Sequence, residues 1–254
     1  MPLNFTNRPL LIAYVTCGDP DLNTTRDIVL AAIAAGASVV ELGVPFSDPV
    51  ADGPVIQRAS QRALQNGTTL RQVIKLAKGI RQRSPAGIII FSYLNPVICM
   101  GLAEFSAAAQ DAGIDGALIT DLPVEEAGQY LEEMRKRNLA TVFLAAPTSS
   151  DERLKRIARA SSGFVYAVSR TGVTGAHKQL PEDAQILVKR LRKHTDLPIA
   201  VGFGIATVGQ FRSLGKFADA AVIGSAIVEI IESHPGEEAQ SVAEFINQFL
   251  ATSY

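Results

Sequence analysis

The fold of this chain is decided by residues 10–43, which begin with Leu10-Leu-Ile-Ala-Tyr-Val15 and end with Ser38-Val-Val-Glu-Leu-Gly43. Both runs are short and almost continuously apolar, which is typical of strands buried on both faces. Between them lies a helical pattern, and we place its start at Thr24 because Asp27 follows three residues later. A strand, a helix and a second strand in this order predict two parallel strands joined by a helical crossover.

The same unit recurs along the chain. Eight apolar runs alternate with helical patterns, and they lie at Leu10–Val15, Ser38–Gly43, Gly87–Tyr93, Gly116–Thr120, Thr141–Ala145, Phe164–Ser169, Pro198–Gly202 and Ala220–Ile223. Apolar residues recur at helical spacing in three of the intervening or final segments, at Val124, Ala127, Leu131 and Met134, at Ala184, Leu187 and Leu191, and at Val242, Phe245, Ile246 and Phe249. A further helix start is marked near Ser150–Asp151.

Eight strand–helix units in 254 residues match the size of a closed (β/α)8 barrel. An open, doubly wound sheet is the alternative, but it normally carries a G-x-G-x-x-G turn after its first strand, and this chain has Thr16-Cys-Gly-Asp-Pro20 there. No linker of changed composition divides the chain. We therefore expect one α/β domain over residues 1–254.

Composition excludes several classes of function. The 24 basic and 25 acidic residues give a net charge of −1, which argues against a nucleic-acid or anionic-membrane partner. The sequence lacks an apolar run of about 18 residues, the length that would predict a membrane-spanning helix, and its start does not resemble a secretory signal. Cys17 and Cys99 have no metal-type spacing and suit a reducing compartment, so we expect a cytoplasmic protein.

Two carboxylates are candidates for proton chemistry. Glu41 interrupts an otherwise apolar strand, and burial there would raise its pKa toward neutrality, so that it could both give and take a proton. Asp52 lies in the long polar stretch from Val44 to Gly53 that follows this strand. Glu41 could instead be a salt-bridged residue at a strand end, and Asp52 a turn former before Gly-Pro.

Glycines after the last strands predict an anion site. Glycine lets the backbone approach a ligand, a helix N-terminus offers unpaired N–H groups, and barrels commonly bind phosphate after strands seven and eight. Each glycine could also belong to an ordinary tight turn. The positions concerned are Gly172 and Gly175 after strand six, Gly202 and Gly204 at strand seven, and Gly224 with Ser225 and Ala226 at strand eight. The long loop 170–180 and the stretch 44–53 are candidate lids.

Other chemistries find little support in the sequence. The three histidines are scattered, no lysine falls on a predicted strand, and no G-x-S-x-G motif occurs. Metal-free and cofactor-free proton chemistry on a small phosphate ester remains. Aromatic residues near the strand ends could line its pocket or simply fill the core, and they are Tyr14, Phe91, Tyr93, Tyr166 and Phe203.

Several blocks, taken in order over nearly the whole chain, resemble the tryptophan synthase α subunit family. The longest is Glu41-Leu-Gly-Val-Pro-Phe-Ser-Asp-Pro-Val-Ala-Asp52-Gly-Pro. The others are Tyr14-Val-Thr-Cys-Gly-Asp-Pro20, Asp121-Leu-Pro-Val-Glu-Glu126, Ser169-Arg-Thr-Gly-Val-Thr-Gly175, Val201-Gly-Phe-Gly-Ile205 and Ile223-Gly-Ser-Ala226. The resemblance implies a TIM barrel that cleaves indole-3-glycerol phosphate to indole and glyceraldehyde 3-phosphate by a retro-aldol reaction.

The resemblance also implies roles for residues. Glu41 matches the family's catalytic glutamate, Asp52 its loop aspartate, and Tyr166 a tyrosine packed near the glutamate. Thr174 matches a lid residue that hydrogen-bonds Asp52 in the closed state. The phosphate cradle is implied at Gly175, Gly204, Gly224 and Ser225, and the indole pocket at Tyr93 and Phe203, to which we add Tyr14 and Phe91.

The family further implies a partner. An α2β2 heterotetramer with a β subunit that carries pyridoxal phosphate is expected, whereas this chain needs no cofactor or metal of its own. We place the β contact near Asp48 and Pro49. Three alternatives stay open at this point: a catalytically weak subunit that mainly activates its partner, a stand-alone lyase that releases indole, and another phosphate-binding barrel such as a sugar-phosphate isomerase or epimerase.

Overall fold

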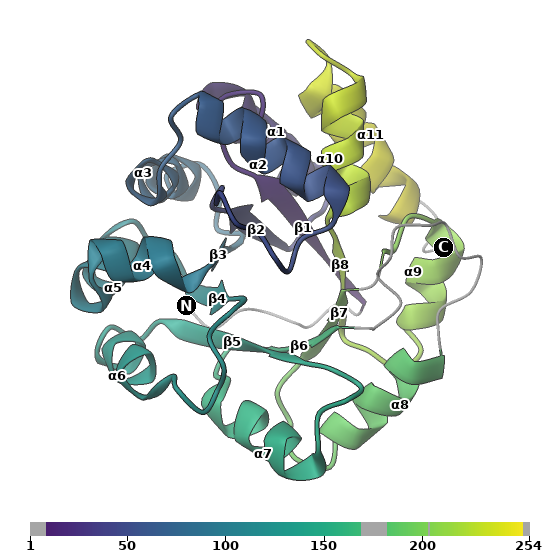
Figure 1. The fold of residues 1–254 in the computed structure, drawn as a ribbon. Helices are drawn as coiled ribbons and strands as arrows, with labels where there is room; N and C mark the ends of the chain where they lie inside the picture. Colours follow the sequence, from purple (N-terminus) through teal and green to yellow (C-terminus); the bar gives the residue numbers. More distant parts are fainter. Residues whose placement is uncertain (1–8, 169–181, 203, 251–254) are drawn as a thin grey trace.

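The computed structural model describes residues 9–168, 182–202 and 204–250, and its eight strands close into one parallel barrel (Figure 1). Each strand pairs with the next in the sequence, and β8 pairs with β1. The strands are β1 Leu10–Thr16, β2 Val39–Gly43, β3 Gly87–Ser92, β4 Gly116–Ile119, β5 Ala140–Ala145, β6 Val165–Val168, β7 Ile199–Gly202 and β8 Ala220–Ile223. The predicted (β/α)8 barrel is therefore confirmed, and the open sheet is excluded.

The helices surround the ring of strands, as Figure 1 shows. They are α1 Leu22–Ala34, α2 Pro54–Gln65, α3 Leu70–Arg81, α4 Leu94–Met100, α5 Leu102–Asp111, α6 Gly128–Lys136, α7 Asp151–Ala160, α8 Glu182–Leu191, α9 Val208–Leu214, α10 Ser225–Ser233 and α11 Glu238–Leu250. No helix within the described residues has the length and apolar character needed to cross a membrane.

Two helix starts differ from the sequence prediction. Helix α1 is capped by Asp21 rather than Thr24, because the Asp21 carboxylate accepts the backbone N–H groups of Asn23 and Thr24 at 2.7 and 3.0 Å. Thr24 lies inside the helix, where its hydroxyl donates to the same carboxylate. Val124 precedes α6, which begins at Gly128. An aspartate closer to the strand thus takes the capping position from the threonine.

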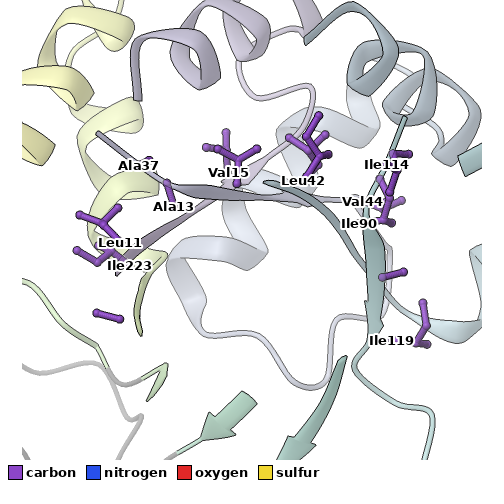
Figure 2. Close-up of a cluster of buried hydrophobic side chains, with 14 of the residues drawn as sticks. Leu11, Ala13, Val15, Ala37, Leu42, Val44, Ile90, Ile114, Ile119 and Ile223 are labelled. Carbon is purple, nitrogen blue, oxygen red and sulfur yellow. The ribbon is translucent and has the colours of Figure 1, made fainter. Parts of the chain in front are cut away.

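Alternate residues of each strand face opposite sides of the barrel wall. One set fills the barrel interior, and it consists of Leu10, Ile12, Val39, Ile89, Leu118, Val142, Phe164, Ala200, Ala220 and Val222. The other set faces the helices, as Figure 2 shows for Leu11, Ala13, Val15 and Leu42. Helix α11 joins this outer layer through Val242, Ile246 and Phe249, so the final helix covers the outside of the barrel as predicted.

The same alternation decides which way Glu41 faces. Val39 belongs to the interior set, so Glu41, two residues later on β2, shares its side of the wall. Tyr14 of β1 is paired in register with Glu41. Because all eight strands are parallel, their carboxyl ends open on one face, which we call the mouth of the barrel.

Candidate active site

Glu41 is a fully buried carboxyl group at the mouth end of the barrel interior, with 0% of its surface exposed. Neither of its carboxyl oxygens has a hydrogen-bond partner within the described residues. Burial raises the pKa of Glu41 to about 8, because the charged form of the carboxyl group loses its hydration. The group is therefore protonated at neutral pH and can act as an acid.

A cavity of about 160 Å³ opens beside Glu41. Its walls combine three aromatic side chains, several small residues and the start of α10, and its lining residues are Tyr14, Glu41, Ile56, Phe91, Tyr166, Gly202, Gly204, Ile205, Val222, Gly224, Ser225 and Ala226. One hollow therefore joins the buried acid to the glycines after β7 and β8. This is the geometry required of a site that holds one end of a molecule while it reacts at the other.

A larger hollow of about 790 Å³ lies at the opposite end of the barrel. Thr141, Ser162 and Pro198 are among its lining residues, and they lie at the beginnings of strands rather than at their carboxyl ends. Barrel enzymes place their chemistry at the carboxyl ends, and the unpartnered acid is there. The smaller cavity is therefore the candidate active site.

The aromatic walls depend on two glycines. The Tyr14 and Phe91 rings meet edge to face, with centroids 5.1 Å apart and planes at 78°. A side chain at Gly43 would overlap the Tyr14 hydroxyl, and one at Gly202 would overlap the Tyr166 hydroxyl. Glycine at these positions lets both tyrosine rings lie across the barrel above the inward-facing core.

Backbone amides are available on the far side of the cavity. Gly204 has a φ of +60°, a conformation that favours glycine, with open space where a side chain would stand. Gly224 is the N-cap of α10, which begins at Ser225, and within the described residues this cap makes no side-chain hydrogen bond to the first N–H groups. These N–H groups and the positive end of the helix dipole suit a phosphate dianion.

Asp52 lies in a neighbouring group rather than in the lining of the cavity. The Tyr93 hydroxyl donates to Asp52 Oδ2 at 3.1 Å and accepts the Ala51 N–H at 2.9 Å, while Phe46 stacks on the Tyr93 ring at a centroid distance of 5.1 Å. Burial raises the pKa of Asp52 to about 6, against the lowering effect of the Tyr93 hydrogen bond. Ile56, four residues further along the chain, does reach the cavity.

Most of the residues singled out in the sequence meet here. The cavity collects Glu41, Tyr14, Phe91, Tyr166, Gly204, Gly224 and Ser225, and Tyr93 and Asp52 form the adjoining pair. Thr174, Gly175, Phe203 and the predicted lid 170–180 lie outside the described residues. Within the described residues, no three histidine, cysteine, aspartate or glutamate side chains are grouped to hold a metal ion.

The sequence reasoning missed other lining residues. Val222 could have been found by following the two-residue alternation along its strand. Ile56 could not, because α2 is an additional helix between β2 and α3 that the count of strand–helix units did not require. Its position over the cavity follows from tertiary packing alone.

The fold and the cavity define a class: a (β/α)8 barrel enzyme with a buried acid at its mouth. The chain matches the family model of the tryptophan synthase alpha chain over residues 2–252. It is 50% identical to the tryptophan synthase alpha chain of Solibacter usitatus, over 93% of this chain and 88% of that one. The corresponding chain of Neisseria meningitidis is 44% identical, over 94% and 92%.

Solved structures agree with the family match. A chain of the tryptophan synthase complex from Pyrococcus furiosus superposes with a TM-score of 0.89 at 39% identity, over 96% of this chain and 98% of that one. This chain belongs to the tryptophan synthase alpha chain family.

Proposed function

We propose that Glu41, Asp52 and the amides around Gly204, Gly224 and Ser225 carry the reaction of this chain. As a member of its family, the chain is a lyase of tryptophan biosynthesis that cleaves indole-3-glycerol phosphate to indole and glyceraldehyde 3-phosphate. The family uses no cofactor in the alpha chain, and pyridoxal phosphate belongs to the β subunit. The residue assignment rests on one observation: Glu41 is buried, has no hydrogen-bond partner among the described residues, and lies in a cavity that reaches Gly204 and the start of α10.

The first step is the transfer of a proton from Glu41 to C3 of the indole ring. Carbon–carbon cleavage without a metal or an imine needs an electron sink, and protonation at C3 converts the ring into one. Glu41 can donate because its raised pKa keeps the proton on the carboxyl group at neutral pH. Asp52, whose pKa near 6 leaves it mostly ionised, stabilises the positive charge that develops at the ring nitrogen.

The second step uses the same carboxyl group as a base. Glu41, now a carboxylate, removes the proton from the hydroxyl on the carbon attached to C3. The electrons of that O–H bond form the aldehyde, the carbon–carbon bond breaks, and its electron pair returns to the ring, which releases indole. Glu41 ends the cycle protonated, as it began, so that no external acid or base is consumed.

Tyr166 and the aromatic wall support this chemistry. Burial and the neighbouring Glu41 raise the pKa of Tyr166 well above its usual value, so the phenol keeps its proton throughout. The Tyr14, Phe91 and Tyr166 side chains make the ring end of the cavity apolar, which excludes water and strengthens the charges that act there. At the other end, the α10 N-terminus and Gly204 hold the phosphate.

The test of this assignment is Glu41→Gln. We expect kcat to fall at least about 1,000-fold, because one group is lost as both acid and base, while binding of glycerol 3-phosphate is retained. Indole release is measured from indole-3-glycerol phosphate, with Glu104→Gln on the exposed side of α5 as the control. Near-normal turnover of Glu41→Gln would remove Glu41 from the mechanism, and an inactive wild-type chain, with or without β subunit, would remove the function.

The partner surface that we propose lies at the mouth. Val50, in the loop after β2, is 87% exposed, and Ile98, on α4 after β3, is 57% exposed. The Ala51 to Tyr93 hydrogen bond ties these two segments together, and Asp48 and Pro49 lie in the same loop. Two large apolar side chains on one rim favour a protein partner, and we propose the β subunit of an α2β2 heterotetramer. The cytoplasmic location expected from the two thiols stays a prediction.

A further inference from the structure

Helix α2 is joined to α10 by the only two charged residues that α2 contains. Arg58 Nε and Nη2 donate to Oε1 and Oε2 of Glu232 at 2.9 and 2.5 Å, and Arg62 Nη1 donates to the same Oε1 at 2.7 Å. Glu232 lies near the end of α10. One carboxylate therefore accepts hydrogen bonds from both arginines of α2, and we call Arg58, Arg62 and Glu232 the clasp.

The clasp extends to the loop between β1 and α1. Arg62 uses its remaining donors on Asp19, with Nε and Nη2 at 2.8 and 2.7 Å from the two carboxylate oxygens, and Asp19 is only 3% exposed. Asn66, just after α2, donates to the backbone carbonyls of Gly18 and Pro20. The carboxyl-terminal half of α2 is thus bonded to two separate parts of the barrel.

Helix α2 also makes apolar contacts. Val55, Ile56 and Ala59 pack against Tyr14 of β1 and Val228 of α10. Apolar contacts hold a helix against its neighbours but are not directional, so they leave its sliding and rotation weakly fixed. Bidentate arginine–carboxylate bonds have a defined geometry, and they can set the position of α2 along α10.

The two helices carry opposite ends of the active site. Helix α2 begins two residues after Asp52, its Gln57 side chain donates to the Asp52 carbonyl at 2.8 Å, and Ile56 lines the cavity. Helix α10 begins with Ser225 at the proposed phosphate cradle. A displacement of α2 along α10 therefore changes the distance between the ring end and the phosphate end of the site.

We propose that Glu232, with Arg58 and Arg62, is a positioning residue for the lyase reaction: it fixes the Asp52 loop relative to the phosphate cradle. This inference rests on the proposed function of the cavity. A substrate that is bound at both ends reacts only if the Asp52 loop and the phosphate cradle are correctly spaced, and a misplacement of about 1 Å can lower the rate about 100-fold. None of the three clasp residues lines the cavity, so each acts through α2 and α10.

The experiment compares Glu232→Gln and Arg58→Gln with the wild type. We expect kcat for indole-3-glycerol phosphate to fall about 10-fold in both. The inhibition constant of glycerol 3-phosphate, which reaches only the cradle, should stay within about 2-fold because the cradle itself is intact. Glu232→Asp keeps the carboxylate and should recover most of the rate. Arg71→Gln is the matched control, because Arg71 forms an ion pair between α3 and α5 and its side chain is 63% exposed, against 50% for Arg58.

Amide hydrogen exchange gives a readout that does not depend on turnover. Residues 54–65 should exchange faster in Glu232→Gln than in the wild type, and as slowly as in the wild type in Arg71→Gln. A wild-type kcat in Glu232→Gln would overturn the proposal. A parallel loss of kcat, of glycerol 3-phosphate affinity and of melting temperature would overturn it as well, because it would assign Glu232 a purely structural role.

The two failures are distinguishable. If the wild-type chain cleaves indole-3-glycerol phosphate and the clasp variants do so equally well, the clasp inference fails and the function stands. If the wild-type chain does not cleave it, the proposed function fails. In that case unchanged exchange over residues 54–65 in Glu232→Gln would also show that the clasp does not hold α2.

Discussion

Acidic side chains that are shielded from water have hydrogen-bond partners at one end of the barrel, whereas Glu41 at the other end lacks them among the described residues. At the end where the strands begin, Asp115 accepts Arg81 at 2.6 Å and the Ile88 N–H at 2.8 Å. Asp219, half-way around the barrel, has the same kinds of partner, an arginine and a backbone N–H, which are Arg192 and the Ile199 N–H. At the mouth, Glu41 is more deeply buried than either and has no hydrogen-bond partner within the described residues.

The paired aspartates at one end of the barrel contribute to stability, whereas Glu41 at the mouth is the candidate for chemistry. Each of the two aspartates bonds to the beginning of a strand and to an arginine at the end of the helix that precedes this strand. The charge of the carboxylate is therefore compensated, and its oxygens have hydrogen-bond partners. Glu41 receives no such compensation from the described residues, and the loss of hydration that raises its pKa also makes its charged form costly to stability. The acids at one end of the barrel are paired, and the candidate acid lies at the other end, where this fold places its chemistry.

The largest effect that we expect from this comparison is on Asp219. Asp219→Ala leaves Arg192 and the Ile199 N–H without this partner, and it should lower the free energy of unfolding by about 3 kcal/mol. The lyase rate at 25 °C should be unchanged, because the site lies at the far end. Urea denaturation gives the stability, and Glu104→Ala, at an exposed ion pair, should behave like the wild type. If Asp219→Ala were as stable as the wild type, the paired aspartates at this end of the barrel would not contribute to stability as we expect.

Glu41→Gln should change stability in the opposite direction, and in a pH-dependent manner. The folded-state pKa of about 8 lies above the ordinary value of 4.5, so between these pH values the folded chain holds a proton that the unfolded chain releases. The wild type must then lose stability as the pH rises through this window. The free energy of unfolding of Glu41→Gln, relative to that of the wild type, should therefore rise by about 3 kcal/mol between pH 5 and pH 8. Parallel stability curves for the two proteins would contradict the burial of an unpaired carboxyl group.

The smallest expected effect concerns Tyr93. In the wild type, kcat/KM should follow a bell with limbs near pH 6 and pH 8, because Asp52 must be ionised and Glu41 protonated. Tyr93→Phe removes the hydroxyl that stabilises ionised Asp52, so the acid limb should move up by less than about one pH unit while the alkaline limb stays. Tyr130→Phe, at a buried tyrosine bonded to the Ala117 carbonyl, is the matched control. Movement of the alkaline limb instead would assign the limbs the other way round.

Much of the fold could be predicted from local patterns. The eight strands were found because each is a short apolar run between turn residues, and Ser150 was found because capping depends only on its neighbours. The start of α1 was predicted wrongly at Thr24, since two nearby side chains competed for one capping position and Asp21 occupies it. Helix α2 escaped notice because nothing in a repeat of strands and helices requires an extra helix over the mouth.

The site, like the fold, has some features with a local sequence signal and others without one. Glu41 and the glycines stood out because a charge within an apolar strand and glycines after strands seven and eight are visible in one dimension. The pairing of Tyr93 with Asp52 joins residues 41 positions apart, and the bond from Arg58 to Glu232 spans 174. Such contacts have no local signal, because only the closure of the barrel brings their partners together.

By itself, the sequence determined the alternation of strands and helices, the parallel barrel that follows from it, and the residue type at each reactive position. The tertiary structure alone decided that Glu41 is cut off from water, that Asp52 is held by a tyrosine, and that α2 is fastened to α10. The physical reason is that hydrogen-bonding periodicity acts over a few residues, whereas loss of hydration and the pairing of charges depend on whatever the folded chain places around a group.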